Sequence, residues 1–169
     1  MSTVASILLG ADGSTAKGGS SRSLSSPADR ARFLDFRKSA DVIVIGGATA
    51  RAENYSRTPS PLIIVSHDQP ETIGVNPQAT WWNISPEESI VKATIEFGEH
   101  VHVEAGLSFL VPLLKLGLID QLRISISTIT GGSHKISLED LTYYFSDVIQ
   151  EEGDETVFLD CARPIAMKK

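Results

Sequence analysis

The 169-residue chain has one cysteine and no long apolar run, and both absences exclude classes of protein. Cys161 has no partner for an internal disulfide or for a cysteine metal site, so we expect it to be a buried thiol. The longest apolar stretches, such as 42–45 and 62–65, are too short to cross a bilayer, and no basic segment followed by an apolar run opens the chain. We therefore expect a soluble, cytoplasmic protein with no membrane partner.

Basic residues are also scarce, because Lys and Arg total 15 against 21 Asp and Glu, for a formal net charge of −6. A protein that follows a nucleic-acid backbone concentrates Lys and Arg to neutralise phosphates, so this balance argues against nucleic-acid binding. A small anionic ligand is still allowed, since backbone N–H groups can bind one or two phosphates. His100 and His102 share one side of a predicted strand, but no third ligand has supporting spacing, so we predict no metal site.

Short β-rich runs alternate with helical patterns, which favours an α/β fold in one domain spanning 1–169. Helix-start signals are clearest at Ser26 and at Ser85, each followed by proline and, three residues after the cap, by an acid. The polar, glycine-rich loop 10–25 is long enough to suggest a functional role. The expected strands are 3–9, 42–45, 62–65, 101–104, 122–129, 145–150 and 156–161, the last two joined by a turn at 151–154, and the expected helices are 26–40, one from Ser85, and 107–116.

Two segments share a further pattern: DVIVIGGAT at 41–49 and VHVEAGLS at 101–108 each run from a strand through glycine into a predicted helix. Glycine lets a ligand approach the backbone, and the first N–H groups of a helix lack internal partners and favour negative charge. Both turns would lie at the carboxyl edge of a parallel sheet and could hold the pyrophosphate of a dinucleotide. For either turn alone the ordinary explanation, a glycine that lets the chain reverse, stays open, and neither turn carries the GxGxxG fingerprint.

The order of segments resembles the reductase domain of riboflavin-biosynthesis deaminase-reductases and their stand-alone relatives, over residues 3–132. The resemblance rests on ADG at 11–13, GGSSRSLSSPADR at 18–30, VIVIGGATARAEN at 42–54 and VHVEAGLSFLVPLLKLGLIDQLRISI at 101–126. It implies a dihydrofolate-reductase-like fold with a mostly parallel central sheet, helices on both faces and a C-terminal antiparallel hairpin. It also implies a homodimer that uses NADPH to reduce the ribosyl group of a phosphoribosylaminopyrimidine to a ribityl chain.

The resemblance assigns the cofactor pocket to the two glycine turns. The positions carried over are Gly46, Gly47, Ala48, Thr49, Ala105, Gly106, Leu107 and Ser108. Ser66 follows the strand 62–65 and could meet the adenosine 2′-phosphate, because no acid stands directly at the strand end, although Asp68 weakens this interpretation.

Two carboxylates are candidates for catalysis. The family's Ser-Leu-Asp-Gly loop falls on 10–13, which makes Asp12 a candidate active-site acid, and the Val-Glu-Gly-Gly turn brings in Glu104. If the substrate opens to a Schiff base, these carboxylates could stabilise positive charge or handle a proton while the protein positions the cofactor. Without the resemblance, a turn-capping carboxylate and a strand-end carboxylate in an ion pair explain the two residues equally well.

The substrate positions implied by the resemblance are Ser21, Ser25, Arg30, Glu53 and Arg57. The serines and Arg30 would hold the substrate phosphate, although Ser25 could instead cap a helix and Arg30 could pair with an acid on its own helix. The sequence departs from the family at two places. Ser14 stands where lysine is common, and the last arginine of the Asp-Asp-Pro-x-Leu-Thr-x-Arg segment is missing, with Arg57 as a possible substitute.

These departures leave the substrate open. A dihydrofolate or pterin-type reductase on the same fold, and a non-catalytic NADPH-binding homologue, stand as the two alternative functions.

Overall fold

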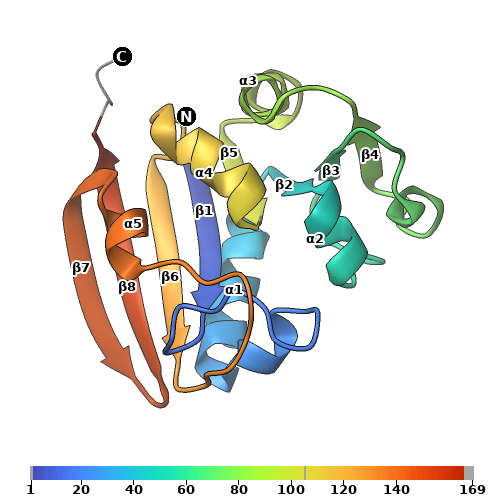
Figure 1. Cartoon of the computed structure of the whole chain (residues 1–169). Helices are drawn as coiled ribbons and strands as arrows, with labels where there is room; N and C mark the ends of the chain where they lie inside the picture. The colour runs from blue at the N-terminus through green and yellow to red at the C-terminus, as the bar shows by residue number, and fades with distance from the viewer. Residues whose placement is uncertain (1, 105, 166–169) are drawn as a thin grey trace.

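The computed structural model describes residues 2–104 and 106–165 of the chain (Figure 1). The elements in chain order are β1 (Ser2–Leu9), the 3-10 helix η1 (Arg22–Leu24), α1 (Pro27–Ser39), β2 (Val42–Gly46), α2 (Gly47–Ala52), β3 (Leu62–Val65), the 3-10 helix η2 (Glu71–Gly74), β4 (Ala79–Trp82), α3 (Pro86–Phe97), β5 (His100–Glu104), α4 (Leu107–Lys115), β6 (Gln121–Ser127), α5 (Leu138–Thr142), β7 (Phe145–Gly153) and β8 (Thr156–Pro164).

The strands form one 8-stranded sheet in the order β4-β3-β2-β5-β1-β6-β8-β7 (Figure 1). Every pairing from β4 to β6 is parallel, whereas β8 pairs with β6 and with β7 in antiparallel fashion. The prediction of a mostly parallel sheet that ends in a C-terminal hairpin is therefore confirmed.

Helices cover both faces of this sheet. In β1, the alternate residues Ala5, Ile7 and Leu9 join an apolar core with α3, α4 and α5. On the opposite face, Ala50 of α2 packs with residues of β2 and β3, and α1 lies against β5, where its phenylalanine rings contact His102. The period-two alternation of the strands thus separates an apolar face from a face that carries polar side chains.

Local signals set the helix ends as the sequence predicts. Ser26 caps α1 by accepting a hydrogen bond from the Asp29 amide at 3.1 Å. Ser85 and Glu88 form the predicted capping box at the start of α3. After α4, Gly117 has a φ of +66°, the left-handed conformation that terminates many helices.

The predicted secondary structure differs from the observed one in three places. The strand β4 and the short helix α5 were not predicted, and the predicted turn at 151–154 lies mostly within β7. The chain reverses at Asp154 and Glu155, where Glu155 adopts a φ of +56°. Both hairpin strands are consequently longer than the sequence analysis predicts.

Cys161 is a buried core residue, as predicted, and burial raises the pKa of its thiol to about 11. In the ranges 2–104 and 106–165, no helix has the length and apolar character needed to cross a membrane.

Candidate functional site

The two glycine turns lie side by side at the carboxyl edge of the sheet. They follow β2 and β5, which are neighbouring parallel strands. Thr49, in α2, accepts a hydrogen bond through its side-chain oxygen from the amide of Gly106, at 3.3 Å. This contact joins the start of α2 to the start of α4, so the backbone of both turns borders the same part of the surface.

Close packing explains two of the glycines. A Cβ atom on Gly46 would lie 3.3 Å from the ring of Phe109, and one on Gly47 would lie 2.7 Å from Cβ of Ser66. A Cβ on Gly106 would meet nothing within 4 Å. The first two glycines therefore allow α4 and the end of β3 to approach β2, whereas Gly106 borders open space.

The surface above the turns consists largely of backbone and small side chains. Ala48, Gly106 and Ser108 are exposed, and Leu107 is half-buried. The first N–H groups of the nine-residue helix α4 have no partner within the helix. Ala105, the remaining residue predicted to bind the cofactor here, lies outside the described residues.

Ser66 is next to this surface but its polar atoms are engaged. Its hydroxyl donates to the Asp68 carbonyl at 2.7 Å, and its own carbonyl accepts from the Trp81 indole nitrogen at 3.0 Å. The structure thus places Ser66 against Gly47, in a turn that also fixes the hydroxyl.

Glu104 ends β5 inside a buried network on the α1 face of the sheet. Its carboxylate accepts two hydrogen bonds from Arg37, each of 2.7 Å, and one from the Tyr55 hydroxyl, of 2.6 Å. The Glu104 side chain is 3% exposed and that of Arg37 is 11% exposed. The guanidinium of Arg37 also lies over the rings of Phe33 and Tyr55. The structure therefore shows the ion-paired form of Glu104, with a partner that the sequence analysis did not single out.

His102 lies beside this pair. Its Nδ1 is 3.4 Å from Oε1 of Glu104, and its Nε2 is 3.0 Å from the hydroxyl of Ser6. Burial lowers the pKa of His102 and raises the pKa of Tyr55 well above its usual value, so both groups are uncharged at neutral pH. Arg37 is therefore the group that balances the charge of Glu104.

Asp12 lies in the loop that follows β1, and β1 is a neighbour of β5 in the sheet. Its carboxylate accepts from the Ser14 hydroxyl and from the amides of Ser14 at 3.2 Å and Gly131 at 2.9 Å. Lys135, which the sequence analysis also did not single out, places its Nζ 3.2 Å from the same carboxylate. The hydrogen bond from the Ser14 hydroxyl, followed by that from Gly131, lowers the pKa of Asp12. Asp12 is therefore a turn-capping carboxylate that stays ionised, and its side chain remains 22% exposed.

Ser21 and Glu53, two of the predicted substrate positions, contact each other. Glu53 Oε1 accepts from the Ser21 amide at 2.6 Å and from the Ser21 hydroxyl at 2.8 Å, and Oε2 accepts from the Ser20 hydroxyl at 3.0 Å. This carboxylate therefore attaches the loop between β1 and α1 to the segment after α2. We refer below to Ser20 and Ser21 as the serine loop.

The remaining predicted substrate residues are not gathered at one point. The Ser25 hydroxyl donates to the Asp29 carboxylate at 2.7 Å, beside the start of α1. Arg30 and Arg57 are both exposed. Within the ranges 2–104 and 106–165, the hydroxyls of the serine loop donate to the Glu53 carboxylate, and the Ser20 hydroxyl also accepts from the backbone amide of Arg22, at 3.0 Å.

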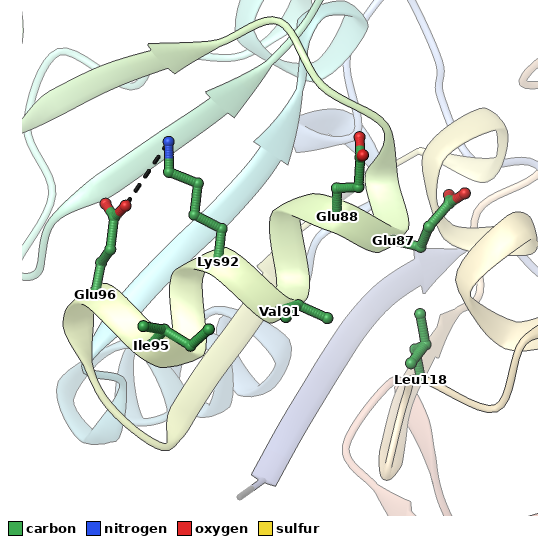
Figure 2. Close-up of a pocket in the computed structure, with 7 residues that line it drawn as sticks. All are labelled: Glu87, Glu88, Val91, Lys92, Ile95, Glu96 and Leu118. Atoms are coloured by element: carbon green, nitrogen blue, oxygen red, sulfur yellow. Dashed lines mark ion pairs between the residues drawn. The ribbon is translucent and has the colours of Figure 1, made fainter.

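Two hollows in the surface lie elsewhere. Figure 2 shows a groove along α3, whose exposed apolar residues Val91 and Ile95 lie between acidic side chains. A cavity of about 320 Å³ lies against the end of α1 and the first residues of β1 and β5, which is the opposite edge of the sheet from the glycine turns. Neither is lined by a residue predicted to bind cofactor or substrate.

Comparison of the chain with solved structures gives the fold. A diaminohydroxyphosphoribosylaminopyrimidine deaminase/5-amino-6-(5-phosphoribosylamino)uracil reductase from Thermotoga maritima has a TM-score of 0.70 at 16% identity, over 97% of this chain and 56% of that one. A pyrimidine reductase-like protein from Corynebacterium diphtheriae has a TM-score of 0.69 at 16% identity, over 95% of this chain and 91% of that one. The dihydrofolate reductase of Enterococcus faecalis, solved with NADP(H), has a TM-score of 0.66 at 19% identity, over 96% of each chain. The predicted dihydrofolate-reductase-like fold is confirmed.

Comparison with curated proteins gives no match. A comparison with family models matches residues 3–143 to the RibD C-terminal domain, which covers the sheet from β1 to β6 and the helices that pack on it. The family predicted from the glycine turns and the loop after β1 is thereby confirmed, and the chain belongs to the RibD C-terminal domain family.

Proposed function

We propose that this protein is an NADPH-dependent reductase that reduces the ribosyl group of a phosphoribosylaminopyrimidine to a ribityl chain, as in riboflavin biosynthesis. The observation that carries the proposal is the contact between Thr49 and Gly106, which joins two glycine turns at the carboxyl edge of a parallel sheet. The family match and the reductases among the similar structures support the same reaction class.

The residues of the two turns fit a dinucleotide. In this proposal the amides of Leu107 and Ser108, which have no partner within α4, and the backbone around Ala48 bind the anionic groups, and Ser66 lies toward the adenosine end. Gly106 supports the fit because a side chain there would meet no protein atom within 4 Å, so the turn is open to a ligand. When bound, the nicotinamide supplies a hydride, and the protein's task is to position it and to exclude water.

We assign the two carboxylates different tasks. Asp12 is ionised and partly exposed, so it can stabilise positive charge that develops on the substrate. Glu104 is buried and balanced by Arg37, so its contribution is to fix the end of β5 beneath the cofactor turn. In this proposal Asp12 is the catalytic residue and Glu104 is a positioning residue.

Two measurements test this function. The first is a fluorescence titration with NADPH and with NADH, in which we expect NADPH to bind more tightly. The second is steady-state NADPH oxidation with the phosphorylated and unphosphorylated aminopyrimidine ribosides and with dihydrofolate. Turnover with dihydrofolate alone would assign the protein to the alternative reductase, and tight NADPH binding without any turnover would favour the non-catalytic homologue.

The variant Asp12→Asn separates binding from catalysis. It keeps the shape of the side chain and removes the charge, so we expect kcat to fall by about 100-fold while NADPH binding stays unchanged. Asp35→Asn makes the same change on an exposed part of α1, where the side chain is 73% exposed, and should leave both quantities unchanged. Equal losses in the two variants would remove Asp12 from the mechanism.

A further inference from the structure

The cavity of about 320 Å³ lies on the α1 face of the sheet, where β1 and β5 begin. Ser2 pairs with His100 in the strand register, and Val4 pairs with His102 two residues further along. These four residues all line the cavity. Ser2 and Leu9 are the two ends of β1, roughly 20 Å apart at the rise of a β-strand. The cavity is therefore separate from the glycine turns, which lie at the other edge of the sheet.

Arg123, in β6, also lines this cavity, which we call the Arg123 cavity. One Nη group of its guanidinium is 2.9 Å from Asp160, and the other donates to the Gln121 side chain at 3.1 Å. Its Nε is buried and has no hydrogen-bond partner among the residues that the structure describes. The guanidinium lies over the ring of Phe36, 4.8 Å from the ring centre. The protein thus leaves part of the hydrogen-bonding capacity of Arg123 unused.

Positive charge is in excess beside the cavity. Arg32 and Arg123 share one acid, because each contacts a different carboxylate oxygen of Asp160. One carboxylate balances only one of the two guanidinium groups, so a single positive charge is left over. Asp41 and Asp120, which lie at this edge of the sheet, accept hydrogen bonds from backbone amides, and neither lines the cavity. Among the described residues, none that lines the cavity carries a carboxylate.

Size and lining restrict what the cavity can hold. Its volume is that of about ten water molecules at about 30 Å³ each, which suits a single substituted ring. Apolar lining comes from Phe36, at the end of α1, and from Val4 and Val101. An arginine binds carboxylates through paired N–H groups, and one unbalanced positive charge matches a monoanion better than a dianion such as phosphate.

We propose that the Arg123 cavity binds a small aromatic monocarboxylate, whose carboxylate pairs with Arg123 and whose ring packs against Phe36 and Val4. This site is additional to the one that we assign to the cofactor, and it does not depend on the reductase proposal. It does adjoin the buried network of the α1 face, because His102 lines the cavity and places its Nδ1 3.4 Å from Glu104.

The test uses benzoate as the probe, with benzamide as a neutral analogue of the same shape and inorganic phosphate as an anion without a ring. Binding to the wild-type protein is followed by NMR through the chemical shifts of labelled backbone amides. We expect benzoate to shift the amides of Val4, His102 and Arg123 and to leave that of Gly106 unchanged. Benzamide and phosphate should each bind at least roughly tenfold more weakly.

Three variants locate the binding. Arg123→Gln removes the charge and should weaken benzoate binding roughly tenfold. Arg163→Gln makes the same change at a side chain of β8 that is 78% exposed and should leave the affinity unchanged. Because Arg123 also packs beside Asp160, Val4→Phe serves as an independent variant that fills the cavity, retains the arginine and should abolish binding. The NMR spectrum and the Tm of each variant report whether it is folded.

Several outcomes would overturn the proposal. These are an absence of localised shifts in the wild-type protein at millimolar benzoate, shifts at Gly106 in place of the cavity, and benzamide binding as tight as that of benzoate. Unchanged benzoate affinity in a folded Arg123→Gln or Val4→Phe variant would overturn it as well. None of these results bears on NADPH oxidation, so the reductase proposal stands or fails by its own measurements.

Discussion

The two faces of the central sheet are built by different chemistry. Toward α3 and α4, the strands contribute mainly apolar side chains, such as Leu122 and Ile124, to a closed core, with Thr3 as a buried polar residue on the same face. Toward α1, alternate positions of the same strands carry His102 and Glu104, which are buried together with Arg37. Stability on the first face comes from burial of apolar area, whereas the second face depends on every buried charge having its partner.

This difference shows where the fold accommodates polar chemistry. Burying an ion pair has a desolvation cost that apolar side chains of the same size avoid. The α1 face nevertheless holds Glu104 directly beneath the turn that we assign to the cofactor. The apolar face forms the core of the sheet, and the polar face places an ion pair at its carboxyl edge.

The largest expected effect on stability comes from breaking the buried pair. Arg37→Met removes the guanidinium and leaves Glu104 buried without its counter-ion, so we expect the free energy of unfolding to fall by about 4 kcal/mol. Urea denaturation followed by circular dichroism measures this change. The double variant Arg37→Met, Glu104→Gln removes both charges and should recover most of the loss. If the double variant is as unstable as the single one, packing of Arg37 on its aromatic neighbours is the main contribution and the contrast between the faces weakens.

A truncation on the apolar face should cost slightly less. Leu113, in α4, is fully buried in the core, so Leu113→Ala should lower the free energy of unfolding by about 3 kcal/mol through lost burial and a residual cavity. The same urea experiment applies, with Leu116→Ala as control because Leu116 is 51% exposed. Similar losses in the two leucine variants would contradict the proposed closed core.

The smallest expected effect on stability comes from the exposed carboxylate of Glu88, in contrast to the buried pair of Arg37 and Glu104. The Ser85 amide and then the Ser85 hydroxyl lower the pKa of Glu88 from its ordinary value of 4.5. Because the pKa is lower in the folded than in the unfolded state, the contribution of Glu88 to stability is present above about pH 4.5 and is lost as the pH falls through the folded-state pKa. The difference in Tm between the wild-type protein and Glu88→Gln should therefore shrink as the solution is acidified from neutral pH. A difference that does not change with pH would show that the capping geometry, and not the charge, matters.

Elements with local signals were predicted, and those that depend on distant partners were not. The starts of α1 and α3 follow from Ser26 and Ser85, whose caps involve residues within one helical turn. The strand β4 was missed because it has four residues, of which only Trp82 is buried, so neither length nor alternation marks it. Its pairing with β3 becomes visible only in the folded sheet.

In the candidate site too, the features with a local signal were predicted and those that depend on distant partners were not. The two glycine turns were predicted as a unit because adjacent parallel strands end at the same edge. The partner of Glu104 was not, because three strands, β2, β3 and β4, lie between Arg37 and β5 in the sequence. A weak signal existed: Phe33 and Arg37 lie one helical turn apart in a helix with few apolar residues, so its buried face had to include a charged one. Lys135 at Asp12 had no such signal.

The position of β1 in the sheet has a consequence for biosynthesis. Although it precedes all other strands in the chain, it pairs on one side with β5 and on the other with β6. On the ribosome, the edge of β1 that faces β5 stays without its partner until Glu104 has been translated, and the other edge until Ile126 has been translated. The loop that carries Asp12 cannot contact Gly131 until that residue has been made. The central strand of the sheet is thus completed by contacts distant in sequence, a topology that slows folding and lengthens the time during which a nascent chain exposes unpaired backbone.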